Sequence, residues 1–186
     1  MKKLFTIMLL VLAFGFVTSS SAQGLGFKAI APQIGLVMPE DPWDMGFHIG
    51  AKINMGELTK DLGLYPFVGY WSSKYTYDAF DLSEDLKLSN IQIGADVHYH
   101  IASMEGLYVG GGLSFNMLSI EFPSYNPFTL ESTTESDSES KIGFGLLAGY
   151  EMPFGSTTGF VQGKYNIISD LNTIELTVGM YFNLGK

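Results

Sequence analysis

The stretch WDMGFHIGAKIN, residues 43 to 54, alternates apolar side chains with polar or small ones without a break. Successive side chains of a strand point to opposite faces, so a strand here has one wholly apolar face. The opposite face carries Asp44, His48 and Lys52 together with two glycines. The pattern therefore predicts a β-strand, and the function of the chain depends on which of its two faces meets water.

The same alternation recurs along the chain and predicts an all-β protein. Unbroken runs predict strands at 43–54, 89–101, 107–117, 141–152 and 173–182. Three weaker runs at 26–37, 64–75 and 159–168 bring the number of predicted strands to eight. Pro32 and Pro66 interrupt the first two weaker runs, whose sides are both fairly apolar, so the pattern does not assign their faces.

The connections between the predicted strands differ in length. We expect long loops at 76–87 and 121–140 and short turns elsewhere. In an antiparallel barrel these two connections lie at the same end. Small outer-membrane barrels show this asymmetry, with short periplasmic turns and longer external loops.

The first 22 residues have the organisation of a secretory signal peptide. Lys2 and Lys3 precede an apolar run from Leu4 to Val17, and Ser20-Ser21-Ala22 is a small-x-small cleavage pattern. The run is shorter than the roughly 20 residues that a spanning helix needs. We therefore expect a signal peptide at 1–22 and a single β domain at 23–186.

Composition excludes several classes of function. The formal net charge is -9, the chain has no arginine, and no basic cluster lies outside the predicted signal peptide. A nucleic-acid partner is therefore not expected. The absence of cysteine excludes disulfides and thiol chemistry.

Glycine is abundant on the polar face of the strands. Glycine weakens a strand and is a poor choice for a solvent-exposed face, but it suits the cramped interior of a closed eight-stranded barrel. We therefore predict that the apolar face meets lipid and the polar face lines the lumen. A soluble barrel or sandwich with an apolar core is the alternative. The glycines concerned are residues 46, 50, 94, 110, 112, 143, 145, 149 and 179.

Aromatic rings mark the ends of the apolar face. Trp43 lies at one end, and Tyr99, Tyr150 and Phe182 lie at the other. Rings at both margins of an apolar band are typical of membrane interfaces. The prediction is an eight-stranded antiparallel up-and-down transmembrane β-barrel.

In these features the chain resembles the small eight-stranded outer-membrane β-barrel family of Gram-negative bacteria, of the OmpA/OmpX-like type. The resemblance covers nearly all of residues 24 to 184. It implies an outer-membrane location, contact with outer-membrane lipid, and assembly by the barrel-assembly machinery. That machinery is thought to recognise a terminal aromatic residue; Phe182 is in the right phase, but Asn-Leu-Gly-Lys follows it. We expect a monomer, and the sequence does not identify an extracellular partner.

Charged and imidazole side chains gather on the predicted lumen face. Buried charges are costly unless paired, so lysines and carboxylates there predict a polar network that plugs the lumen. A narrow pore for small solutes or hydrophobic compounds is the alternative. The predicted network comprises Asp44, His48, Lys52, Asp96, His98, His100, Lys141, Glu151, Lys164 and Glu175.

Metal binding, lipid modification and cation binding by the acidic loops are the chemical alternatives to a structural role. His98 and His100 share a strand face with Asp96, but a His-x-His pair is a weak signal for metal, and we expect neither a metal nor a cofactor. A lipid-modifying enzyme would need a nucleophile, a base and an acid near the outer rim, whereas these histidines lie near the other end and no G-x-S-x-G motif occurs. The acidic loops can bind divalent cations or repel anionic partners, although they match no calcium-loop signature. We expect a structural or surface-interaction role and no enzymatic activity.

Overall fold

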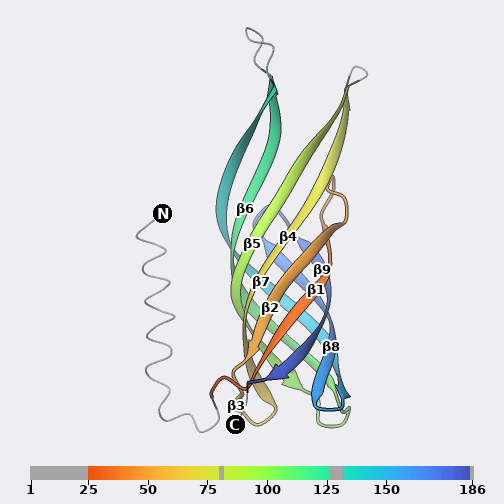
Figure 1. Cartoon of the computed structure of the whole chain (residues 1–186). Helices are drawn as coiled ribbons and strands as arrows, with labels where there is room; N and C mark the ends of the chain where they lie inside the picture. The colour runs from red at the N-terminus through yellow and green to blue at the C-terminus, as the bar shows by residue number, and fades with distance from the viewer. Residues whose placement is uncertain (1–24, 80–81, 126–131, 185–186) are drawn as a thin grey trace.

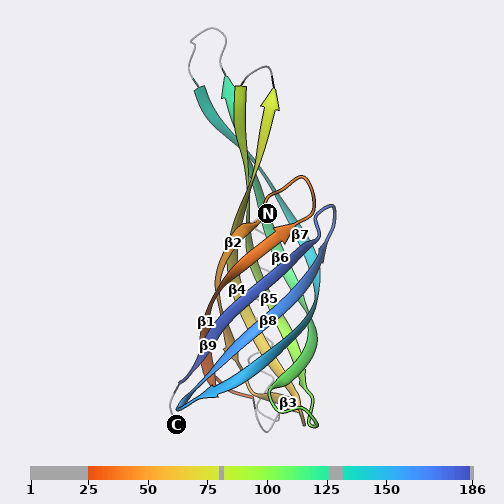
Figure 2. The ribbon, with the colours of Figure 1, turned by 90° about the vertical axis from the view of Figure 1, so that its right-hand side faces the viewer.

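The computed structural model describes residues 25–79, 82–125 and 132–184, and the predicted signal peptide lies outside these ranges. Eight long strands close into an antiparallel barrel, because β1 pairs with both β2 and β9 while β2 also pairs with β4 (Figures 1 and 2). The predicted fold class is confirmed. The strands are β1 (Ala29–Pro39), β2 (Gly46–Asn54), β3 (Glu57–Thr59), β4 (Leu62–Ala79), β5 (Leu82–His100), β6 (Leu107–Tyr125), β7 (Ser132–Phe154), β8 (Thr157–Ile168) and β9 (Thr173–Asn183).

In the described part of the chain, no helix is both long enough and apolar enough to span a membrane.

The two faces of β2 are sharply different. Phe47 and Ile49 are 79% and 61% exposed, whereas His48 and Lys52 are 3% and 2% exposed. The apolar face therefore points outward and the polar face lines the interior, as the alternation predicted.

The structure also assigns the faces of the two strands that contain proline. In β1, Ala31 and Gln33 are buried inside the barrel, and in β4 Tyr65 and Trp71 are buried. Pro32 lies on the exposed side of β1. Both strands thus follow the same inward and outward alternation as their neighbours.

The two segments predicted as long loops are largely strand. Pairing of β4 with β5 continues to Ala79 and Leu82, and pairing of β6 with β7 continues to Tyr125 and Ser132. Pairing between β5 and β6, however, ends at Lys87 and Glu121. Two separate hairpins, which we call the β4–β5 stem and the β6–β7 stem, therefore rise above the barrel (Figures 1 and 2). We call the end of the barrel beneath them the outer mouth.

At the opposite end, the segment predicted as a simple turn near 55–62 contains the short strand β3. Glu57 pairs with Gly63 and Thr59 with Leu62 across a tight reversal. Asp61 takes a φ of 65° in that reversal, a left-handed conformation that Asp tolerates better than most residues.

The glycines of the polar face are closely surrounded by other atoms. A Cβ atom built at any of the nine would lie within 2.0 to 2.8 Å of another heavy atom. The nearest atom is a backbone oxygen of the neighbouring strand at Gly46, Gly50, Gly94 and Gly110, and a side-chain atom at the other five. A larger side chain would therefore clash at each of these positions.

Candidate functional site

Two buried charges of the lumen form an ion pair between β8 and β5. Lys164 Nζ lies 2.7 Å from Asp96 Oδ1, and each side chain is 5% exposed. Gly112 and Gly145 are register partners on the two strands in between. A Cβ at Gly112 would lie 2.1 Å from Asp96 Oδ1, and one at Gly145 would lie 2.3 Å from Lys164 Cε. The two glycines leave the space across which the pair forms.

Other buried polar side chains form separate hydrogen bonds across the lumen. Lys52 Nζ donates to Gln162 Oε1 at 2.7 Å, and the Tyr108 hydroxyl donates to the same oxygen at 3.1 Å. Gln92 Nε2 donates to Glu175 Oε1 at 2.9 Å. These contacts link β2 and β6 to β8, and β5 to β9, across the lumen.

A stack of three rings adjoins the network on the side away from the outer mouth. His98 lies between Tyr65 and Tyr108, with ring centroids 3.9 and 4.4 Å apart and interplanar angles of 17° and 9°. His98 is fully buried. This arrangement uses the imidazole as a flat packing surface. Over the residues that the structure places, no group of three or more His, Cys, Asp or Glu side chains is arranged to hold a metal ion.

Beneath the stems, the interior changes from polar to apolar. Six buried apolar residues form a cluster there, which we call the outer apolar layer and which was not predicted from the sequence. Its signal was the strand phase, because Leu88 and Leu118 continue the inward side of strands that carry Asn90 and Asn116 two residues deeper. The layer consists of Val37, Trp71, Leu88, Leu118, Ile168 and Leu171.

The ten residues predicted to line the lumen lie in three parts of the structure. His100 and Glu151 meet at the end away from the outer mouth, where their side chains are 3.7 Å apart and only partly buried. Lys141 lies at the outer mouth, and Asp44 is exposed in the turn before β2, so the placement of Asp44 in the lumen is corrected. The six that are buried in the lumen are His48, Lys52, Asp96, His98, Lys164 and Glu175.

The four aromatic residues predicted to lie at the membrane interface differ in their positions. Tyr99, Tyr150 and Phe182 are 49%, 43% and 45% exposed on the outward face. Trp43 instead packs against the outer apolar layer and makes an edge contact with Tyr75 at 6.2 Å between centroids. Its assignment as a lipid-facing ring is therefore corrected, because the segment before β2 folds over the mouth.

A polar vestibule opens at the end of the barrel opposite the outer mouth. It encloses a volume of about 500 Å³. Tyr65, His100 and Glu151 lie on its barrel side, and Lys28 and Glu57 lie on its rim. The interior is therefore approached through polar groups at this end and through apolar groups at the other.

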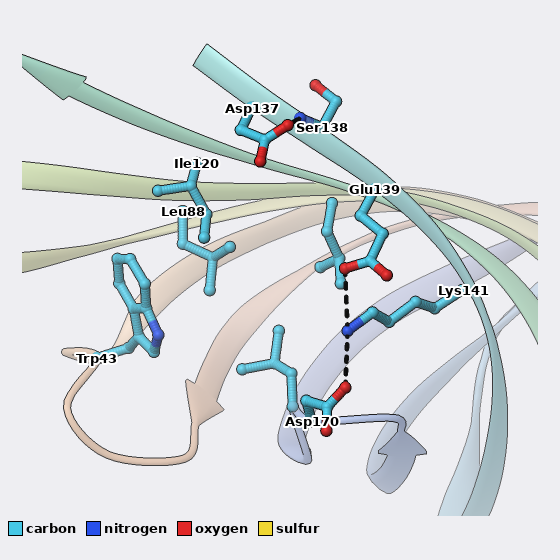
Figure 3. Close-up of a pocket in the computed structure, with 10 residues that line it drawn as sticks. Trp43, Leu88, Ile120, Asp137, Ser138, Glu139, Lys141 and Asp170 are labelled. Carbon is cyan, nitrogen blue, oxygen red and sulfur yellow. Dashed lines mark hydrogen bonds and ion pairs between the residues drawn. The ribbon is translucent and has the colours of Figure 1, made fainter. Parts of the chain in front are cut away.

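A second cavity, of about 250 Å³, lies at the outer mouth. Figure 3 shows Lys141 between Glu139 and Asp170, at 3.2 and 3.1 Å, with Trp43 across the cavity. The hydrogen bond from Lys141 holds the pKa of Asp170 below its ordinary value. We call this cavity the mouth pocket; it is lined by Trp43, Leu88, Leu118, Ile120, Asp137, Ser138, Glu139, Lys141, Asp170 and Leu171.

A closed barrel with an apolar outer face and a polar interior is the architecture of an integral membrane protein, because closure lets the strands of the barrel wall pair their backbone groups with one another. The chain belongs to the outer membrane protein beta-barrel domain family, whose sequence profile matches residues 6–183. Family membership supports a location in the outer membrane and contact with its lipid.

Solved structures show the same fold. The attachment invasion locus protein Ail of Yersinia pestis, in complex with the heparin analogue sucrose octasulfate, is 16% identical with a TM-score of 0.52 and covers 84% of this chain and 99% of that chain. Neisserial surface protein A is also 16% identical, with a TM-score of 0.53 and coverage of 87% and 99%. No curated protein matches the chain.

Proposed function

We propose that the protein is a non-conducting outer-membrane barrel that displays two acidic hairpin stems outside the cell for surface interaction. The observation that carries the sealed lumen is the Lys164–Asp96 pair, 2.7 Å long and 5% exposed on both sides. A hydrated ion would have to separate these charges, and an unpaired charge in such surroundings costs several kcal/mol.

The outer apolar layer supports the same conclusion. Trp71 and Leu88 are 0% and 2% exposed, so the layer is closed over the polar network. Ions do not readily cross a dry apolar constriction. A permeating solute would have to open both the apolar layer and the ion pair beneath it, which argues against the alternative of a narrow pore.

The lumen also argues against a lipid-modifying activity. His48 and His98 are 3% and 0% exposed and point into the interior. A lipid on the outward face cannot reach them. The family supports a non-enzymatic role, and export by the signal peptide, assembly by the barrel-assembly machinery and a monomeric state remain predictions.

The stems carry the proposed interaction role. Glu135, Asp137 and Glu139 lie on one face of the β6–β7 stem and are exposed. Ail binds a polysulfated sugar analogue, whereas acidic stems repel polyanions. We expect this protein to prefer uncharged or cationic partners and to show no binding to sucrose octasulfate.

Planar-bilayer recording tests the sealed lumen. Purified wild-type protein should give no steady conductance, whereas a Trp71→Ala/Leu88→Ala/Lys164→Ala variant that still shows heat-modifiable gel mobility should give measurable current. Steady conductance from the wild type would contradict the plug and favour the pore.

Cysteine labelling of intact cells tests the orientation of the stems, since the chain has no native cysteine. Glu135→Cys should react with a membrane-impermeant maleimide in intact cells. The matched control Glu105→Cys, exposed in a turn at the other end, should react only after the outer membrane is permeabilised. The reverse pattern would place the stems in the periplasm.

A further inference from the structure

The mouth pocket has features that neither the plug nor the stems require. Trp43, Leu88 and Ile120 form its apolar part, and Asp137, Glu139 and Lys141 form its polar part (Figure 3). Asp137 lies beside Ile120, its register partner on the neighbouring strand. Ligand pockets combine an apolar lining with a few polar groups that fix orientation. At about 250 Å³, it lies just below the roughly 300 to 1,000 Å³ typical of small-molecule sites. A small ligand fits this volume better than a segment of folded protein.

The apolar side of the pocket is supported from below. Leu88 and Leu118 are 2% and 7% exposed and belong to the outer apolar layer, against which Trp43 packs. Tyr75 contacts the edge of the Trp43 ring. This side is therefore a fixed surface, with an indole that is accessible from the pocket.

The polar side carries more negative than positive charge. Lys141 pairs with both Glu139 and Asp170, so one ammonium serves two carboxylates. Asp137 forms no ion pair with any side chain that the structure describes, and its Oδ1 accepts a hydrogen bond from the Ser138 backbone N–H. The net negative charge of this part of the pocket favours the binding of a cation.

The arrangement suits an organic cation better than a metal ion. The carboxylates are spread along one wall, and no three of the described His, Asp or Glu side chains converge as metal ligands. An ammonium needs only one or two carboxylates, and an indole face attracts it further. An apolar body attached to the ammonium would replace water on Leu88 and Ile120.

We propose that the mouth pocket binds a small organic cation, an ammonium with an apolar or aromatic body. The ammonium is held by Asp137 and Glu139, and the body lies on Trp43, Leu88 and Ile120. This site lies above the outer apolar layer, so it does not depend on whether the lumen conducts.

Tryptophan fluorescence of the refolded full chain tests the proposal, because Trp43 is one of only two tryptophans and lines the pocket. The probe is phenethylammonium, compared with its uncharged isostere phenethyl alcohol. The detergent should carry an uncharged sugar headgroup, so that the micelle supplies no competing ammonium.

We expect phenethylammonium to change the fluorescence saturably and phenethyl alcohol to bind about tenfold more weakly, the effect of losing one charge-assisted hydrogen bond. Asp137→Asn and Glu139→Gln should each weaken phenethylammonium binding to a similar degree. The matched control Glu135→Gln removes a charge two residues further along the same exposed face, outside the pocket lining, and should leave the affinity unchanged.

Three results would overturn the proposal. They are the absence of a saturable change in the wild type, equal binding of the alcohol and the ammonium, or equal effects of Asp137→Asn and Glu135→Gln. Both side chains are exposed on the stem, so heat-modifiable mobility should confirm that each variant folds before its affinity is compared.

Discussion

The interior of the barrel contains two layers that are built in opposite ways. In the middle, Lys164 and Asp96 are buried with their charges paired, and hydrogen bonds link their neighbours. At the outer mouth, Trp71, Leu88 and Leu118 exclude water with side chains that have almost no polar atoms. The stability of the charged layer therefore depends on how its charged groups are placed, whereas the stability of the apolar layer depends on how completely its side chains fill the available volume. In the sealed lumen that we propose, the apolar layer also keeps water from the charges below, which strengthens their attraction.

The largest effect should come from removing one charge of the buried pair. Lys164→Met leaves the Asp96 carboxylate without its partner and should lower the free energy of unfolding by about 3–5 kcal/mol. Reversible urea unfolding in lipid vesicles would measure it. The double variant Lys164→Met/Asp96→Leu should recover most of the loss. A single-variant loss below about 1 kcal/mol would mean that water reaches the pair and the contrast between the layers is wrong.

The apolar layer should respond to lost volume. Leu88→Ala should cost about 3 kcal/mol, the sum of a transfer term and a cavity term. The control Leu113→Ala removes the same atoms from a side chain that is 55% exposed on the outward face of β6. Lipid can fill that space, so its loss in the same unfolding experiment should be roughly 1 kcal/mol smaller. Equal losses would show that the layer is loosely packed.

Filling the space beside the ion pair should also lower the stability of the barrel. Gly145→Ala places a methyl group where a Cβ would be 2.3 Å from Lys164 Cε, and the strain should cost about 2 kcal/mol. At Gly163 the nearest atom would be 3.5 Å away, an ordinary contact, so Gly163→Ala should leave the urea midpoint nearly unchanged. Similar midpoints for the two variants would contradict the tight fit.

The smallest loss of stability should come from breaking a solvent-exposed ion pair. Lys87 Nζ lies 3.6 Å from Glu121 Oε2, with side chains 42% and 40% exposed. Lys87→Ala should cost less than about 0.5 kcal/mol, and the difference should vanish in 1 M salt. A loss close to that of Lys164→Met would show that burial does not distinguish the two pairs.

The sequence was informative wherever one rule applied along a whole strand. Alternation placed His48 and Lys52 inside and Phe47 outside, because a strand repeats every two residues whatever its partners are. The partner of each charge was not predictable. Lys164 and Asp96 are 68 residues apart, and their contact depends on the register and stagger accumulated over several strand pairs.

The errors occurred where local composition and tertiary pairing disagree. The segment 121–140 is rich in serine and acids, which are poor strand formers, yet most of its described residues pair across the β6–β7 stem because the hairpin below extends its register. Trp43 was placed from strand phase, although β2 begins only at Gly46. A residue before a strand need not keep that phase.

The end of β5–β6 pairing at Lys87 and Glu121 has an evolutionary consequence. Above this point each stem is a two-stranded unit that is joined to the rest of the protein only through its own base. Insertions, deletions and substitutions in one stem therefore leave the register of the other and of the barrel unchanged. Mutations can therefore accumulate in each stem separately, as long as the barrel strands below keep their alternation of inward and outward side chains.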